Sequence, residues 1–363
     1  MNSLSGGTVM PYNMSRRRAL ATGTAAGMLI GTSCTDIRQQ PKEKEIPSSE
    51  KSWWYPGATR ELVRDLTPGA TPIRLACMTS ETMLNYPENG SITEAVKHIR
   101  DMGYTAANSH YGMGARNKWL DASDSEITEL KDALTKFDVD FFDTMVWTNL
   151  LHPDEKTRQN NLKYVCEAFE ACERVGCRSV TGITGSRGTD FYAEMHPDNW
   201  TGETWKITID SIRQIFRDTT GFKTAWAMEA CITSNIDTPI AHKRLMEDVG
   251  DPRFKICLDP TNMTSLETYY HSTETLNESF DLLGENILNC HAKDFLMTRE
   301  MYIHIEEVPP GKGLQDYETY LVRLSRLSWP RTLMLEHFPP EAYPPAKAFI
   351  ERTADKVGVK IYS

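Results

Sequence analysis

The sequence lacks the short motifs that mark the commonest nucleotide and nucleic-acid sites. No GxGxxG or GxxxxGK[ST] turn follows the first apolar segment, so nothing indicates a dinucleotide site or a P-loop. There is no CxxC pair of the kind that holds structural zinc. Basic residues do not cluster after residue 18, and 40 basic against 50 acidic residues leave a formal charge of −10. A compact acidic chain repels phosphate backbones, which argues against a nucleic-acid partner.

Residues 1–34 have the composition of a signal segment. Three consecutive arginines at 16–18 precede a weakly apolar stretch from Ala21 to Ile30, which is too short to span a bilayer. The arginines resemble a twin-arginine export signal, and the residues before Cys34 resemble a lipoprotein acylation site. We therefore predict an exported bacterial protein of the periplasm or envelope, with membrane contact only through a lipid anchor at Cys34. A disordered basic N-terminus is the alternative.

Residues 35–65 are polar and contain proline, which predicts a tether, and residues 66–363 are long enough for one barrel domain. The eight cysteines of an exported chain raise the question of disulfides. Most of them, however, fall in or beside predicted buried strands, and Cys166 and Cys172 lie six apart on one predicted helix without sharing a face. We therefore predict that the cysteines are reduced.

From about residue 72, short apolar segments alternate with amphipathic ones. Helical spacing predicts helices over residues 95–102, 125–137, 154–175 and 205–219, the first opened by the capping-box pattern Ser91-Ile-Thr-Glu94. This alternation favours a parallel sheet, and eight units favour an α/β fold closed into a (β/α)₈ TIM barrel rather than a doubly wound sheet. Residues 186–204 and 295–310 are predicted to be long loops at the carboxyl-terminal rim. The predicted strands are Ile73–Met78, Tyr104–Asn108, Val139–Trp147, Arg178–Thr184, Thr224–Glu229, Phe254–Leu258, Ile287–His291 and Thr332–Glu336.

Four polar residues end the last four predicted strands, namely Glu229, Asp259, His291 and Glu336. Any one of them alone is commonly a solvated strand end. In a barrel, however, these strand ends are adjacent and point toward one axis. Three buried carboxylates repel one another unless a cation binds them. The set therefore predicts a site for one divalent metal ion, with Mn²⁺, Co²⁺ or Mg²⁺ as the best matches and Zn²⁺ also compatible.

The segments AMEA, CLDPTN, CHAKD, PPGKGLQDY and MLEH carry these residues, and together they resemble the sugar phosphate isomerase/epimerase family of xylose isomerase-like barrels. That family includes D-tagatose 3-epimerase and inosose dehydratase. The resemblance covers residues 72–355 and is strongest in the second half. It implies that the four residues bind one metal ion and that Glu229 and Glu336 also transfer protons. Asn262 stands where the epimerases carry a histidine that contacts the substrate.

Such a site acidifies the C–H bond beside a metal-bound carbonyl, so a carboxylate can remove the proton and form an enediolate. Reprotonation gives an epimer or isomer, whereas loss of a β-leaving group gives a lyase product. Lys293 shares the strand face of His291, so it contacts either the substrate or Asp294. The other predicted substrate-binding residues are His110, Trp147, His152 and Asn262.

The first hypothesis is a metal-dependent isomerase or epimerase that binds a small sugar or keto-sugar, and family barrels of this kind often form homo-oligomers. The second is a lyase or dehydratase that acts on a 3-keto-glycoside or inosose. An endonuclease-IV-like enzyme would need three zinc ions, further histidines and a basic groove, which the charge and the leader oppose. A non-catalytic sugar-binding protein would have no need of all four ligands.

Overall fold

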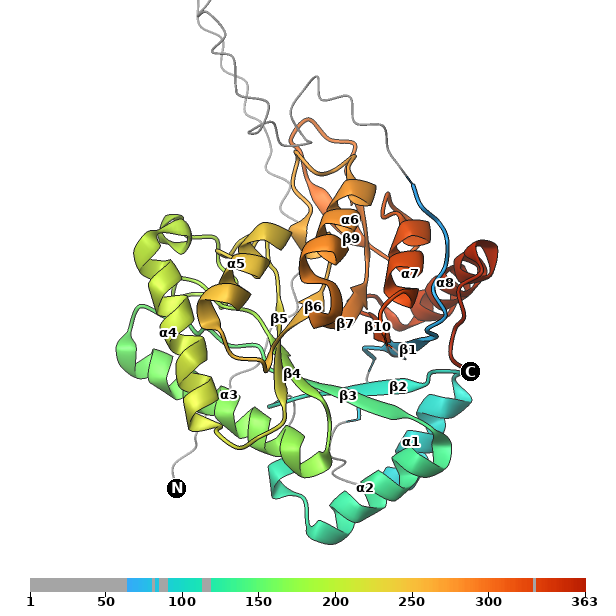
Figure 1. The fold of residues 1–363 in the computed structure, drawn as a ribbon, viewed down its shortest axis with the longest axis horizontal. Coiled ribbons are helices and arrows are strands. Elements are labelled where there is room, and N and C mark those ends of the chain that lie inside the picture. The colour runs from blue at the N-terminus through green and yellow to red at the C-terminus, as the bar shows by residue number, and fades with distance from the viewer. Residues whose placement is uncertain (1–63, 80–81, 85–90, 113–118, 329–330) are drawn as a thin grey trace, which may run out of the picture. The chain divides into compact units, whose positions relative to one another are not determined.

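Eight parallel strands form one curved sheet with helices on its outer side in the computed structural model (Figure 1). The structure describes residues 64–79, 82–84, 91–112, 119–328 and 331–363. The strand order is β1-β10-β7-β6-β5-β4-β3-β2, so the sheet curls into a nearly closed barrel, as the sequence predicts. The barrel strands are β1 (Ile73–Cys77), β2 (Ala106–His110), β3 (Asp140–Met145), β4 (Ser179–Gly182), β5 (Ala225–Glu229), β6 (Phe254–Leu258), β7 (Ile287–Ala292) and β10 (Arg331–Leu335).

The seam of the barrel lies between β1 and β2, which do not form a ladder. The Thr105 N–H donates to the carbonyl of Leu75 at 3.1 Å and bridges the lower part of this seam. Higher up, Met83 forms an isolated parallel bridge with Asn108 of β2. Among the described residues, isolated hydrogen bonds rather than a ladder close the seam, and neither β1 nor β2 carries a predicted metal ligand.

Most helices begin at a residue whose side chain accepts a hydrogen bond from the first helical turn. Ser91 accepts a hydrogen bond from the Glu94 N–H at the start of α1, and Ser123 forms a full capping box with Glu126 at the start of α2. The helices are α1 (Ile92–Asp101), α2 (Asp124–Phe137), α3 (Glu155–Val175), α4 (Gly202–Asp218), α5 (Pro239–Val249), α6 (Ser272–Leu283), α7 (Tyr317–Ser325) and α8 (Tyr343–Val357). Short 3₁₀ turns are η1 (Trp119–Asp121), η2 (Pro197–Trp200), η3 (Thr261–Met263), η4 (Gly284–Asn286) and η5 (Pro340–Ala342).

The larger apolar core packs between the sheet and the helices, and a smaller one fills part of the barrel interior. The middle of the interior is polar near β3, β4 and β7. Asp143 is fully buried there, and its Oδ1 accepts hydrogen bonds from the hydroxyls of Ser179 at 2.6 Å and Thr181 at 2.8 Å. Burial raises the pKa of Asp143 to about 7, although these hydroxyls oppose the shift. The barrel therefore encloses an acid that titrates near neutrality.

The segment after β7 differs from the predicted loop. Residues 294–308 form an antiparallel hairpin of β8 (Asp294–Met297) and β9 (Ile305–Val308). The prediction of a plain loop over residues 295–310 was therefore wrong. The reason is that seven residues connect the two short strands, whereas the sequence signal for a hairpin is a turn of about two residues rich in glycine or asparagine.

Two cysteines are paired, contrary to the prediction that all are reduced. Cys172 near the end of α3 and Cys177 just after it form a disulfide, with their Cα atoms 5.1 Å apart. Gly176 ends the helix with a φ of 85°, and this left-handed turn brings residue 177 back against the last helical turn. Helical spacing does not predict that contact. Five other described cysteines are free, as predicted.

The predicted signal segment, the Cys34 acylation site and nearly all of the predicted tether lie outside the described residues. Among the residues that are described, no helix has the length and apolar character needed to cross a bilayer.

Candidate metal centre

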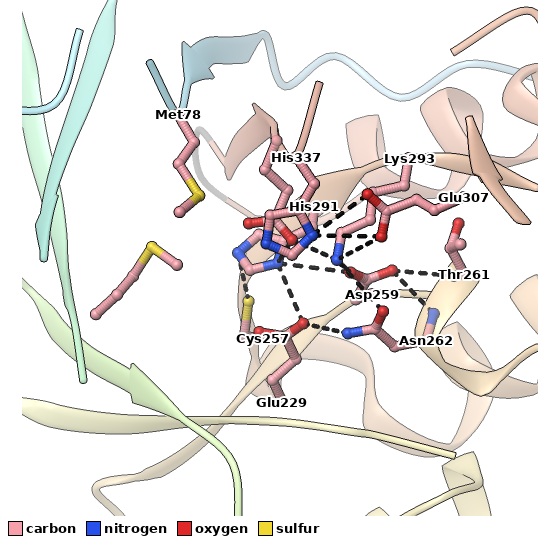
Figure 2. Close-up of polar contacts among 12 residues, drawn as sticks. Met78, Glu229, Cys257, Asp259, Thr261, Asn262, His291, Lys293, Glu307 and His337 are labelled. Atoms are coloured by element: carbon pink, nitrogen blue, oxygen red, sulfur yellow. Dashed lines mark hydrogen bonds and ion pairs between the residues drawn. The ribbon is translucent and has the colours of Figure 1, made fainter. Parts of the chain in front are cut away.

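Four strand ends bring the predicted ligands together at one rim of the barrel. Glu229 ends β5, Asp259 follows β6, His291 lies near the end of β7, and Glu336 follows β10. The ligand atoms of these four side chains all lie within 4.8 Å of one another, and the residues are at most 2% exposed. Figure 2 shows Glu229, Asp259 and His291 converging. The structure thus confirms the convergence that the sequence predicts.

His291 lies at the centre of the group. Its Nδ1 is 3.0 Å from Glu336 Oε1, 3.4 Å from Glu229 Oε1 and 3.6 Å from Asp259 Oδ2. The other ring nitrogen, Nε2, is 3.2 Å from Cys257 Sγ. The thiol therefore holds the ring so that Nδ1 faces the carboxylates, which is the usual arrangement of a metal-binding histidine with an outer partner.

The donor atoms fit a divalent ion. Glu229 Oε2, Asp259 Oδ2, His291 Nδ1 and both oxygens of Glu336 are buried, and none makes a directed hydrogen bond to the described part of the chain. Of these atoms, Glu229 Oε2 and Glu336 Oε2 also lack an ion-pair contact among the described residues. Buried polar atoms normally have partners, so these two oxygens indicate a missing ligand. Three carboxylates and one imidazole are a hard, oxygen-rich donor set of the kind that Mn²⁺, Mg²⁺ and Co²⁺ accept and that Zn²⁺ tolerates.

The pKa values of Glu229 and Glu336 are shifted in opposite directions. Burial raises the pKa of Glu229, although His291 opposes that rise. Burial also acts to raise the pKa of Glu336, but the nearby cations His291 and Lys293 prevail and hold it well below its usual value. The pKa of His291 is raised well above its usual value because the surrounding acidic groups outweigh the effect of burial.

Local backbone structure fixes Asp259. Its Oδ1 accepts the backbone N–H groups of Thr261 at 3.0 Å and Asn262 at 3.2 Å, at the start of η3. This leaves Oδ2 to face the centre. The hydroxyl of Tyr320, on α7, contacts the carbonyls of Leu258 and His291 and ties β6 to β7 just below the site.

Two of the predicted substrate-binding residues lie in the centre itself. Asn262 donates from Nδ2 to Glu229 Oε1 at 2.5 Å, and its Oδ1 accepts from Lys293 Nζ at 3.3 Å. Lys293 Nζ is 2.8 Å from Asp259 Oδ2 and 2.6 Å from Glu336 Oε1. The sequence also allowed a salt bridge between Lys293 and Asp294. In the structure Lys293 contacts Asp259 and Glu336 instead.

Asp294 instead organises the turn after the hairpin. Its two oxygens accept four backbone N–H groups, from Phe295, Gly311, Gly313 and Gln315, at 2.8–3.0 Å. A Cβ added at Gly313 would stand 2.4 Å from Asp294 Oδ1. The Gly-Lys-Gly segment is therefore a turn wrapped around a carboxylate, which explains why glycine is needed there.

Trp147, predicted to bind substrate, forms an aromatic wall with Tyr192 and Phe191. Trp147 stacks on Tyr192, with ring centroids 6.3 Å apart and planes inclined by 17°, and Phe191 lies 4.3 Å from Tyr192. The pKa of the Tyr192 phenol is raised chiefly by burial, and the charges of Glu229, Lys293 and Glu336 also affect it. The aromatic wall therefore belongs to the same mouth of the barrel as the metal centre.

The two predicted histidines belong to β2 and to the segment before α3. His110 ends β2, where burial lowers its pKa to about 4 and keeps the ring neutral at pH 7. His152 lies before α3, and its Nδ1 accepts the Asp154 N–H at 3.1 Å. No interaction between His152 and the four ligands occurs among the described residues.

Sequence reasoning missed Cys257, Glu307, His337 and Tyr192. A signal existed for Cys257, which precedes Asp259 by two residues and therefore shares its face of β6. Glu307 belongs to the hairpin that was predicted as a loop, and its Oε2 is 3.5 Å from Lys293 Nζ. His337 contacts Glu307 and has a left-handed φ of 68°, which the sequence does not indicate.

Comparison with known proteins decides the family. The profile of the xylose isomerase-like TIM barrel family matches residues 96–353. The chain belongs to this family. No curated protein matches the sequence closely enough to count as a relative.

Solved xylose isomerase-like barrels share the fold at low sequence identity. A 3-keto-D-glucoside 4-epimerase from E. coli is 18% identical over 77% of this chain and 99% of its own, with a TM-score of 0.55. The IOLI protein, solved with a bound zinc atom, is 17% identical over 79% and 96%, with a TM-score of 0.54. A probable 3-DHS dehydratase from Bacillus anthracis is 15% identical over 77% and 97%, with a TM-score of 0.56. Proteins of this fold thus include both epimerases and a dehydratase.

Proposed function

We propose that this protein is a divalent-metal-dependent sugar isomerase or epimerase that moves a proton on the carbon beside a carbonyl group through an enediolate. The observation that carries the proposal is the convergence of four buried ligands whose donor atoms lie within 4.8 Å of one another. The bound ion would polarise the carbonyl oxygen and stabilise negative charge on it. A structure of the same fold was solved with a bound zinc atom, which supports a metal ion in this protein too.

Glu229 and Glu336 have the opposite pKa shifts that an acid and a base need. Glu336 is held ionised by the neighbouring cations and suits removal of the proton. Glu229 is pushed toward its neutral form by burial and suits return of a proton. Asn262 orients Glu229 through the hydrogen bond to Oε1. We assign Lys293 to hold a substrate oxygen, since its ammonium already lies among the carboxylates.

The mouth of the barrel has two chemically different sides, which suits a sugar. The ligands of β5, β6, β7 and β10 form a charged side, whereas Met78, Met145 and Trp147 pack together on the side of β1 and β3. A sugar ring presents hydroxyl groups on some faces and C–H groups on others, and aromatic rings such as Trp147 and Tyr192 pack against apolar faces. We therefore propose a small sugar or keto-sugar as the substrate, with His110 and His152 as further candidates for binding it.

A lyase or dehydratase acting on a keto-sugar is the second candidate. The same enediolate expels a leaving group when one is attached to the next carbon. A probable dehydratase among the structures of similar fold favours this candidate, whereas the 3-keto-D-glucoside 4-epimerase supports a keto-sugar as the substrate of either candidate. We further propose export to the periplasm or envelope, on the basis of the arginine-rich leader. We also propose a lipid anchor at Cys34 and a homo-oligomer.

Deuterium exchange tests both candidates. The Mn²⁺-loaded protein is incubated in D₂O with ketoses, inososes and 3-keto-glucosides, and the products are examined by NMR. Deuterium in an epimer or isomer supports the first candidate, whereas deuterium together with an unsaturated product supports the second. The control is Glu336→Gln, which keeps the size of the side chain but removes the base. Equal exchange by wild type and this variant contradicts the assignment of Glu336, and absence of exchange from every substrate contradicts the proposed function.

A further inference from the structure

The ammonium of Lys293 contacts two of the oxygens that would bind a metal ion. Lys293 Nζ is 2.8 Å from Asp259 Oδ2 and 2.6 Å from Glu336 Oε1, the same two atoms that face His291 Nδ1. The side chain is 1% exposed, so the ammonium has no access to water as an alternative partner. In the metal-free protein, Lys293 therefore neutralises part of the charge that a divalent ion would otherwise neutralise.

An ammonium and a divalent cation cannot both lie close to these oxygens without strong repulsion, because the site is buried and water does not screen it. Lys293 therefore needs another anionic partner once a metal is bound. Among the described residues, the other carboxylate in ion-pair contact with it is Glu307, whose Oε2 is 3.5 Å from Nζ. Figure 2 shows Glu307 on the far side of Lys293 from Glu229.

Glu307 is held in place independently of Lys293. It lies on β9, where it pairs with Phe295 of β8. Both of its oxygens are 3.3 Å from His337 Nδ1. His337 directly follows Glu336 and has a left-handed φ of 68°, a conformation that costs energy for a residue with a side chain. The hairpin and His337 thus present a fixed carboxylate next to the ammonium.

We propose that Lys293 is a resident cation that exchanges Asp259 and Glu336 for Glu307 when a metal ion binds, so that Glu307 is a positioning residue that sets metal affinity. The inference rests on the proposed function, because it requires the four residues to bind a metal. Without metal, Lys293 offsets one carboxylate of the centre; with metal, Lys293 and Glu307 form a neutral pair beside it.

Isothermal titration calorimetry with Mn²⁺ alone tests the inference on the folded full-length chain. Glu307→Gln removes the second partner of Lys293, and we expect it to weaken Mn²⁺ binding by about tenfold, the usual scale for loss of an outer partner. Glu306→Gln is the matched control, because Glu306 is the neighbour on the same strand, is exposed as Glu307 is and loses the same charge, but has no ion pair with Lys293 among the described residues. We expect its affinity to stay within about twofold of wild type, as for an exposed charge in water.

A double-variant comparison separates the proposed exchange from simple loss of a distant negative charge. In the Lys293→Met background, Glu307→Gln is expected to leave Mn²⁺ affinity unchanged, because the ammonium that needed the partner is gone. Glu307→Asp keeps the charge and is expected to bind Mn²⁺ more tightly than Glu307→Gln. Equal affinity of Glu307→Gln and Glu306→Gln, or a full effect of Glu307→Gln in the Lys293→Met background, would overturn the inference. Absence of Mn²⁺ binding by the wild type would instead overturn the proposed function on which it rests.

Discussion

The buried carboxyl of Asp143 makes the free energy of unfolding of this barrel depend on pH. Substitution of Asp143 should remove that dependence. Its carboxyl is fully buried, and its pKa is raised from 3.8 to about 7. In the unfolded chain the carboxyl loses its proton near pH 4, whereas in the folded chain it keeps the proton up to about pH 7. Between these values the folded state binds more protons than the unfolded state, so the contribution of Asp143 to stability falls as pH rises.

The size of the effect follows from the pKa shift. One unit corresponds to about 1.4 kcal/mol, so a shift of about three units amounts to about 4 kcal/mol over the whole window. Most experiments would cover only pH 5 to 7, where the expected change is about 2–3 kcal/mol. Asp143→Asn is similar in shape to the protonated acid and can still accept the hydroxyls of Ser179 and Thr181. The variant should therefore fold and should lack this pH dependence.

Urea unfolding of wild type and Asp143→Asn at several pH values, with chelator present, measures the difference directly. The free energy of unfolding of the variant minus that of the wild type should rise by about 2–3 kcal/mol between pH 5 and 7 and then level off. Taking the difference removes the contributions of groups that are common to both proteins. A difference that stays constant from pH 5 to 8 would refute the reasoning, since it would mean that Asp143 titrates alike in both states.

Three further predictions address the metal centre and the mouth of the barrel. Glu336→Gln should lower kcat by at least about 100-fold, the usual contribution of a general base, while far-UV circular dichroism stays that of wild type; wild-type kcat in this variant would exclude Glu336 as the base. Cys257→Ala removes the partner of His291 Nε2 and should weaken Mn²⁺ binding by about tenfold in calorimetry. Cys290→Ala, also buried, serves as its control and should bind Mn²⁺ as wild type does, so equal losses in both variants would point to general destabilisation. Tyr192→Ala removes the centre of the aromatic wall and should raise KM with little change in kcat, as expected for loss of uniform substrate binding; an unchanged KM in steady-state assays would place the sugar elsewhere.

Several features of the fold could be predicted because they depend on local pattern. The strands around Glu229 and Asp259 are apolar segments of suitable length, each ending in a carboxylate, and they are found close to the predicted bounds. The Ser91 cap of α1 follows from a short-range hydrogen bond to the Glu94 N–H. Such interactions lie within a few residues, so the sequence expresses them directly.

Other features depend on contacts between distant segments. The hairpin of β8 and β9 carries Glu307 to Lys293, and this contact could not be seen while residues 295–310 were predicted as a loop. The Cys172–Cys177 disulfide depends on the left-handed turn at Gly176 rather than on helical spacing. The aromatic wall joins Trp147 after β3 to Tyr192 after β4, and the sequence of neither segment indicates this contact.

The order of apolar and polar residues alone determined the barrel and indicated the four candidate metal ligands, because parallel strands that close on themselves must bring their carboxyl ends to one rim. Tertiary structure alone decided which cation neutralises that rim, which thiol orients His291, and how strongly Asp143 holds its proton. Those properties arise from burial and from charges a few ångströms apart, and a linear sequence does not record distances between segments that meet only after folding.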